Sequence, residues 1–320
     1  MAKYESIHGV KIRDYTTDPD TLSTGQVWYD KTAQALQYQA ANTAGSWASG
    51  GNLNTARYVH GGAGIQTAGL AFGGYIDSGS GQGETETYNG SAWSEVADLN
   101  TARLNTGGFG LQPAAICVGG SPGGKANAES WNGSGWTEVN DLNTGRHAHG
   151  ASGISTSGIA YGGTPPGFLD VAESWNGTSW TEVADLNTAR YYPGSIGASN
   201  TSALVVGGYT PPHTANVETW NGTAWAEGNN LNTSRLGSGG AGTVTEGLAF
   251  GGSQDPPQLG NAEQYNGTSW TEVADLSTAR AYPGGAGTQA SALAFGGAPK
   301  TAATEEYTSP ILSTKTVDTD

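Results

Sequence analysis

The side chains in this chain that could do chemistry are few, and the most closely spaced pair is His147 and His149. On a regular strand, residues two apart point to the same side, so both imidazoles would face one way and could form part of a metal site. No third ligand is evident beside them. The single cysteine, Cys117, stands in an apolar run, which favours a buried side chain over a metal ligand or a disulfide. We therefore predict no metal site and no cofactor.

Carboxylates offer a second kind of chemistry, because an enzyme that cleaves glycans needs two of them at a catalytic distance. Asp77, Asp170 and Asp255 are the candidates. They stand in three different copies of a repeat that runs along the chain, so nothing in the sequence brings two of them together. We predict that no residue is catalytic and that the protein is not an enzyme, with glycan cleavage as the weakest alternative.

Tyrosine and histidine side chains are more numerous, and they stand where copies of the repeat stop agreeing. Aromatic rings can stack on sugar rings, and their polar tips can bond to hydroxyl groups. Variable residues on a constant frame are typical of a binding surface, although drift in unconstrained loops would leave the same pattern. The candidate ligand-binding residues are Tyr58, His60, His147, His149, Tyr191, Tyr192 and Tyr282 after the repeat arginines, and Asp170, Tyr209 and Asp255 in loops.

The elements that must position these side chains are set by the repeat. Near-copies of Leu-Asn-Thr-Ala-Arg recur every 43 to 46 residues, starting at Leu53, Leu99, Leu142, Leu186, Leu231 and Leu276. Each is followed by a Gly/Ala-rich run, an apolar run ending in Gly-Gly, a variable loop, a strand ending in an aromatic, an Asn-Gly turn and a Trp strand. This order predicts a four-stranded antiparallel sheet with strands A to D, in which Asn-Gly supplies a tight hairpin turn. The D-to-A links and B-to-C loops then emerge on one face.

Gly162-Gly163, the aromatic Trp175 and the following Trp180, repeated at this period, resemble the kelch repeat of β-propellers. The resemblance covers roughly residues 47 to 309 and implies an all-β fold. There are six Arg-to-Gly-Gly halves but only five Asn-Gly-x-x-Trp turns. We therefore predict a six-bladed β-propeller of four-stranded antiparallel blades, closed by an N-terminal strand around Trp47 that completes the last blade.

The residues that recur in every copy are expected to build the blades. The repeat arginines could instead form a cationic ring for an acidic ligand, but each copy has a Glu in strand C that can take up its arginine. We therefore expect each Arg to tie neighbouring blades together and each Trp to pack between them. These structural residues are Arg57, Arg103, Arg146, Arg190, Arg235 and Arg280, and Trp47, Trp93, Trp136, Trp180, Trp225 and Trp270.

The N-terminal part carries a second resemblance. Asp18-Pro19-Asp20, then residues 24–30, then Gln37-Tyr38, are similar to the lead-in of tail-fibre and other virion appendage proteins of bacteriophages with Gly/Thr-rich kelch-like repeats. The resemblance implies a virion protein that binds a host-surface glycan or protein and is attached to other virion proteins through its N-terminal segment. A purely structural decoration or fibre subunit is the alternative.

Boundaries follow from these patterns. We expect an attachment segment and linker at 1–24, the propeller at 25–310 with a lead-in hairpin and closing strand at 25–52, and a tail at 311–320. Val10–Arg13 is expected to form a short strand.

Composition limits the partners. The formal net charge is −15, and the chain has no run of Lys and Arg, so nucleic acid and anionic membranes are poor candidates. No apolar run is long enough to span a bilayer, so no membrane insertion is expected. The segment Met1–His8 lacks the apolar core of a secretory signal. We expect a protein made in the host cytoplasm and carried on the virion, extracellular once released.

Overall fold

The computed structural model describes residues 13–15, 26–41, 45–76, 81–309 and 312–316. Every regular element in these residues is a β-strand. The chain divides into two compact units: Ser46–Ser309, and Met1–Gly45 together with Pro310–Asp320. In the described part of the chain there is no helix of the length and apolarity that crossing a bilayer requires.

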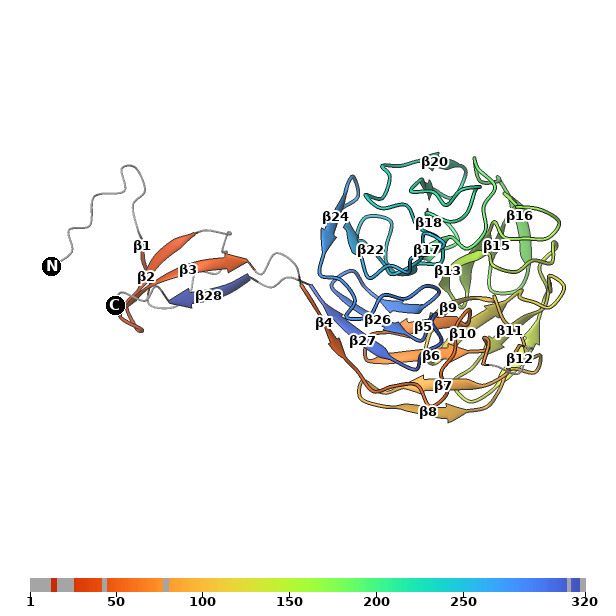
Figure 1. Ribbon diagram of the computed structural model, residues 1–320, viewed down its shortest axis with the longest axis horizontal. Helices are drawn as coiled ribbons and strands as arrows, with labels where there is room; N and C mark the ends of the chain where they lie inside the picture. The colour runs from red at the N-terminus through yellow and green to blue at the C-terminus, as the bar shows by residue number, and fades with distance from the viewer. Residues whose placement is uncertain (1–12, 16–25, 42–44, 77–80, 310–311, 317–320) are drawn as a thin grey trace. The chain divides into compact units, whose positions relative to one another are not determined.

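The unit Ser46–Ser309 is a six-bladed β-propeller (Figure 1). Each blade is a four-stranded antiparallel sheet, as the repeat predicts. The blades are β5 (Gly61–Ile65), β6 (Ala68–Phe72), β7 (Thr85–Tyr88), β8 (Trp93–Val96); β9 (Gly107–Leu111), β10 (Ala114–Val118), β11 (Ala128–Trp131), β12 (Trp136–Val139); β13 (Gly150–Ile154), β14 (Ser157–Tyr161), β15 (Ala172–Trp175), β16 (Trp180–Val183); β17 (Gly194–Ser199), β18 (Ser202–Val206), β19 (Val217–Trp220), β20 (Trp225–Glu227); β21 (Gly239–Gly242), β22 (Gly247–Phe250), β23 (Ala262–Tyr265), β24 (Trp270–Val273); and β25 (Gly284–Gly287), β26 (Ser291–Phe295), β27 (Thr304–Thr308), β4 (Ser46–Ser49). We number them blade 1 to blade 6 in this order.

The last blade confirms the predicted closure. Its outer strand is β4, from the N-terminal side of the propeller, and it pairs antiparallel with β27 so that Trp47 lies opposite Tyr307. The Trp47 ring contacts Tyr307 and Phe250, each at a centroid distance of 5.1 Å. At the centre, the inner strands contact one another in a closed ring, with β25 beside β5. Because the ring is closed, every inner strand has another inner strand on each side.

The blades pack through the Trp that opens each strand D. Trp136 of blade 2 lies edge-on to Phe72 of blade 1 at 4.9 Å, and Trp225 of blade 4 does the same to Tyr161 of blade 3 at 5.2 Å. Blade 2 has the smaller Val118 at this strand B position, and there Trp180 of blade 3 packs with Val118 and with Phe109 of strand A. The repeat thus places large aromatic side chains at every blade interface, where their burial is most favourable.

The Asn-Gly turns between strands C and D have the expected geometry. In blade 3, Asn176 Oδ1 accepts hydrogen bonds from the backbone nitrogens of Thr178 and Ser179, both at 2.9 Å. Gly177 has φ of +91°, a conformation that suits glycine best. These turns lie at the opposite ends of the strands from the variable loops, so they fix the blade without taking part in the variable face.

The second unit holds a four-stranded sheet of β1 (Arg13–Tyr15), β2 (Val27–Asp30), β3 (Ala35–Ala41) and β28 (Leu312–Thr316), in the order β1-β2-β3-β28. The antiparallel pair β2 and β3 is the predicted hairpin. The sequence assigns this hairpin to the propeller and leaves 311–320 as a tail, whereas the structure pairs β3 with β28 in a sheet of their own. Most of the predicted attachment segment, residues 1–12 and 16–24, lies outside the described residues, as do Val10 to Ile12 of the expected strand.

Candidate binding face and channel mouth

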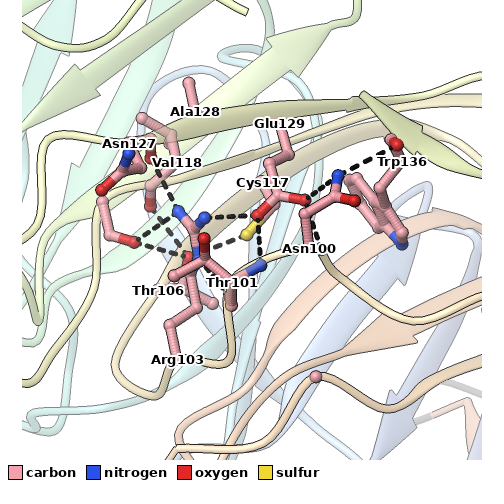
Figure 2. A network of polar contacts seen from close by, with 12 residues as sticks. Asn100, Thr101, Arg103, Thr106, Cys117, Val118, Asn127, Ala128, Glu129 and Trp136 are labelled. Atoms are coloured by element: carbon pink, nitrogen blue, oxygen red, sulfur yellow. Dashed lines mark hydrogen bonds and ion pairs between the residues drawn. The ribbon is translucent and has the colours of Figure 1, made fainter. Parts of the chain in front are cut away.

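The repeat arginines are buried inside the blades, where they form hydrogen bonds and ion pairs, as Figure 2 shows for Arg103. Arg103 Nη2 donates to Glu129 Oε1 at 2.5 Å, and Nη1 donates to the Asn127 carbonyl at 2.7 Å. The other carboxylate oxygen accepts from the backbone and side-chain nitrogens of Asn100 at 2.8 and 3.0 Å. Asn100 belongs to the link that enters blade 2 from blade 1, so Glu129 fastens the link to the blade that follows it.

The same ion pair occurs in all six blades. The pairs are Arg57 with Glu86, Arg103 with Glu129, Arg146 with Glu173, Arg190 with Glu218, Arg235 with Glu263 and Arg280 with Glu305. All twelve side chains are buried. Removing one partner of such a buried pair lowers the free energy of unfolding by several kcal/mol, because the other charge is then buried without a partner. The arginines therefore hold the frame and offer no cationic ring to a ligand.

Directly after the arginines, the chain forms a ring around the propeller axis. The second residue past each Arg has a positive φ between 51° and 61°. In five of the six, the backbone nitrogen donates to the carbonyl of the corresponding residue in the preceding blade, at 2.6 to 2.9 Å. We call the six residues the mouth ring: Val59, Asn105, Ala148, Tyr192, Gly237 and Tyr282. Their side chains, together with those of the next residue, line the opening of the axial channel.

The positive φ of Ala148, 54°, corrects the expectation for His147 and His149. The two residues do not share the face of a strand, because β13 begins only at Gly150. His147 forms a bridge with Thr164, with backbone hydrogen bonds of 2.8 and 3.1 Å. His149 turns into the channel wall beside blade 2. Across the residues that the structure describes, no three His, Cys, Asp or Glu side chains group closely enough to hold a metal ion.

An aromatic patch, formed by Phe168, Tyr191 and Tyr209, lies on the loops of blades 3 and 4. Phe168 stacks on Tyr191 at 5.0 Å with an interplanar angle of 14°, and both contact Tyr209 at 5.8 and 5.3 Å. Phe168 is 40% exposed. The ring contacts continue from Tyr191 to Tyr192 at 5.0 Å and from Tyr192 to Tyr282 at 4.7 Å. A continuous row of aromatic rings thus leads from the loop of blade 3 to the channel mouth.

The tyrosines of the mouth stay uncharged at neutral pH. Burial, followed by the neighbouring hydroxyls of Tyr191 and Tyr58, raises the pKa of Tyr192 to about 12. Burial also raises the pKa of Tyr282, with Tyr192 as the next cause. The Tyr192 hydroxyl donates to Asn105 Oδ1 at 2.8 Å, which links blade 4 to blade 2. At neutral pH these hydroxyls are therefore protonated and can donate and accept hydrogen bonds.

The remaining candidates are not members of the mouth ring or of the aromatic patch. Tyr58 contacts Tyr75 at 5.3 Å within blade 1. Asp255 is exposed in the loop of blade 5, and its charge contributes, after burial and neighbouring tyrosines, to the raised pKa of Tyr282 and Tyr191. Asp170 lies beside the link to blade 4, where its carbonyl accepts from the Leu186 nitrogen at 2.9 Å. Asp77 lies outside the described residues.

Sequence reasoning did not include Phe168 among the candidate residues and did not anticipate the hydrogen bond from Tyr192 to Asn105. The sequence does set Phe168 apart, because the other four phenylalanines all lie in strands A or B of the repeat. A lone Phe in a variable, Pro/Gly-rich loop is exposed without a structural need.

Comparison with protein-family models finds none that matches this chain, and no curated protein matches it significantly. The structure therefore establishes a six-bladed propeller of four-stranded blades, and the nearer relationships rest on the residues alone.

Proposed function

We propose that this protein is a kelch-like, non-enzymatic binding module of a bacteriophage virion appendage, similar to a tail fibre. Its variable loop face is presented to a glycan on the host surface. The observation that carries the proposal is the aromatic patch, because the exposed ring of Phe168 stacks on the half-buried Tyr191, and Tyr209 packs edge-on against both, on loops that differ from blade to blade. Such rings suit the apolar face of a sugar, with hydroxyls nearby for hydrogen bonds.

A host-surface protein is a second possible ligand for the same face, and a purely structural role in the virion remains the alternative function. The terminal sheet supports an attachment to other virion proteins. Val27 and Tyr38 pair directly across β2 and β3, and with Tyr29 they form an apolar surface whose members are 39%, 37% and 37% exposed. Exposed apolar residues gathered on one face of a sheet favour contact with another protein.

The proposal is tested by measuring binding of the full chain to a glycan array and to host cells, before and after Phe168→Ala combined with Tyr191→Ala. Loss of stacking should lower the affinity about tenfold. Ile154→Ala is the matched control, since Ile154 is 44% exposed, similar to Phe168 at 40%, but lies at the β13–β14 turn, away from the variable loops. Equal binding by the double variant would remove the patch as the ligand site.

Electron microscopy of the particle separates the two functions. A loop face open to solvent supports the receptor-binding proposal. A loop face buried against another virion subunit supports the structural alternative instead.

A further inference from the structure

Two cavities meet at the mouth of the axial channel, and their shared wall suggests a second site that is independent of the aromatic patch. The outer cavity measures about 100 Å³ and the inner one about 130 Å³. One residue from each blade, directly after the mouth ring, lines both cavities. These six residues are His60, Thr106, His149, Pro193, Ser238 and Pro283.

Three of these side chains carry polar atoms that bond to nothing in the protein. Both ring nitrogens of His60, both ring nitrogens of His149 and the hydroxyl of Ser238 are buried and have no hydrogen-bond partner. The three side chains are only 8%, 7% and 9% exposed. Buried polar groups in folded proteins are normally paired, so five unpaired atoms around one opening make it a candidate site for a hydrogen-bonding ligand or for ordered water.

Thr106, at the equivalent position of blade 2, differs from these three side chains because it finds a partner inside the protein. Thr106 Oγ1 donates to the Val118 carbonyl of its own blade at 2.9 Å. The three unpaired side chains belong to blades 1, 3 and 5. Each of them, His60, His149 and Ser238, packs against a glycine of the preceding blade. A Cβ at Gly107 would lie 2.6 Å from His149 Nε2, and one at Gly284 would lie 2.7 Å from His60 Nε2. The glycines leave the space that the two imidazoles occupy.

Charge restricts what this opening can hold. Burial, and secondarily Arg57 and Arg146, lowers the pKa of His60 and of His149 to about 3, so both rings are neutral near neutral pH. Neither cavity is lined by an Asp, Glu, Lys or Arg side chain. A neutral imidazole has one donor and one acceptor. A hydroxyl group can both donate and accept, whereas a phosphate or carboxylate group only accepts and an ammonium group only donates.

We propose that the channel mouth binds the hydroxyl groups of a small uncharged polyol or of a sugar terminus, held by His60, His149 and Ser238. Tyr192 and Tyr282 stand at the entrance, where their rings contact each other at 4.7 Å. Each cavity has room for about three or four water molecules, which matches a three-carbon triol or the hydroxymethyl arm of a sugar more closely than a whole sugar ring.

The test follows the ring-proton signals of His60 and His149 by nuclear magnetic resonance in the full chain. Glycerol represents a free polyol, methyl glucoside represents a sugar terminus, and glycerate is the charged comparison. Saturable shifts of both histidines are expected with glycerol, methyl glucoside or both, and not with glycerate. Ser238→Ala should weaken binding about three- to tenfold, the effect of one lost hydrogen bond. It should leave the melting temperature unchanged or higher, because the hydroxyl has no partner in the protein.

Ser157→Ala is the matched control, since the Ser157 hydroxyl donates to Asn200 Oδ1 at 2.8 Å and does not line either cavity. It should lower the melting temperature and leave the affinity unchanged. The proposal is overturned if neither uncharged probe shifts the histidine signals, which would leave only water in the channel. It is also overturned if glycerate binds as well as glycerol, or if Ser238→Ala changes stability without changing affinity. Loss of glycan binding in the Phe168 and Tyr191 variant has no bearing on these outcomes.

Discussion

At the scale of single residues, two histidines give this protein a dependence on pH. His60 and His149 are buried as neutral rings, and their pKa in the folded state is lowered from 6.5 to about 3, by burial first and then by Arg57 and Arg146. In the unfolded chain both rings bind a proton below pH 6.5. The stabilising effect of the neutral rings is therefore fully present above pH 6.5 and is lost as the pH falls towards 3.

We expect the folded protein to lose about 1.4 kcal/mol per pH unit for each of these histidines within that window. The measurement is urea unfolding at several pH values, in the wild type and in a variant with His60→Gln and His149→Gln. The double variant should show a shallower decline below pH 6.5. His213→Gln, in the loop between β18 and β19, serves as the control and should follow the wild type. Parallel curves for wild type and double variant would contradict the assignment.

The candidate site could be predicted from the sequence only in part, and the reason lies in the mouth ring. The sequence placed the variable residues after each Arg, and the structure brings Tyr192 and Tyr282 together there. It could not show that Ala148 has a positive φ, because hydrogen bonds from Ala148 to Asn105 and from Tyr192 to Ala148, between blades, hold that conformation. A local pattern therefore suggested a strand for His147 and His149 where the tertiary structure imposes a turn.

At the scale of elements, the inner strands carry small residues, mostly Gly, Ala and Ser, so that six strands fit around one axis. Gly240 of β21 illustrates the constraint, because a Cβ added there would lie 2.3 Å from the Ser195 carbonyl oxygen of β17. That oxygen belongs to the backbone, so it cannot move away as a flexible side chain could. The strands must separate instead, and the contacts along both sides are weakened.

Gly240→Ala is expected to lower the free energy of unfolding by about 1 to 3 kcal/mol, the usual cost of overpacking. The measurement is a urea denaturation curve. Gly135→Ala is the matched control, because its added Cβ meets no atom within 4 Å and its φ is not positive. It should change stability very little. If Gly240→Ala is as stable as Gly135→Ala, close approach of the inner strands does not limit the side chain at this position.

At this scale the sequence predicted well where one signal is repeated six times. The strands, the Asn-Gly turns and the closing strand around Trp47 all follow from comparing copies. It missed β28, which has no copy elsewhere in the chain for comparison. β28 pairs with β3, with Leu312 opposite Ala41, across more than two hundred residues of chain. Its sequence, Leu-Ser-Thr-Lys-Thr, has one apolar residue and no alternating pattern to mark it as a strand.

At the scale of the whole molecule, the propeller is complete between Ser46 and Ser309. Its first strand, β4, pairs with its last, β27, and the Trp47 indole nitrogen donates to the Ala274 carbonyl of blade 5 at 2.9 Å. No strand of the propeller pairs with β1, β2, β3 or β28 in the sheets of the described residues. The unit therefore contains the contacts that close its own ring.

A fragment of residues 46–309 is expected to fold by itself and to unfold at the same urea concentration as the propeller of the full chain, monitored by tryptophan fluorescence. A fragment of residues 53–309 lacks β4, so β27 loses its outer partner and the place of Trp47 beside Phe250 and Tyr307 is left empty. Trp47 is partly buried, so its loss should cost less than the figure typical of a fully buried Trp, about 3 to 5 kcal/mol, and an unpaired strand edge promotes association between chains. The shorter fragment should therefore unfold at lower urea and form larger species in sedimentation. Equal behaviour of the two fragments would mean that the ring does not depend on its N-terminal strand for closure.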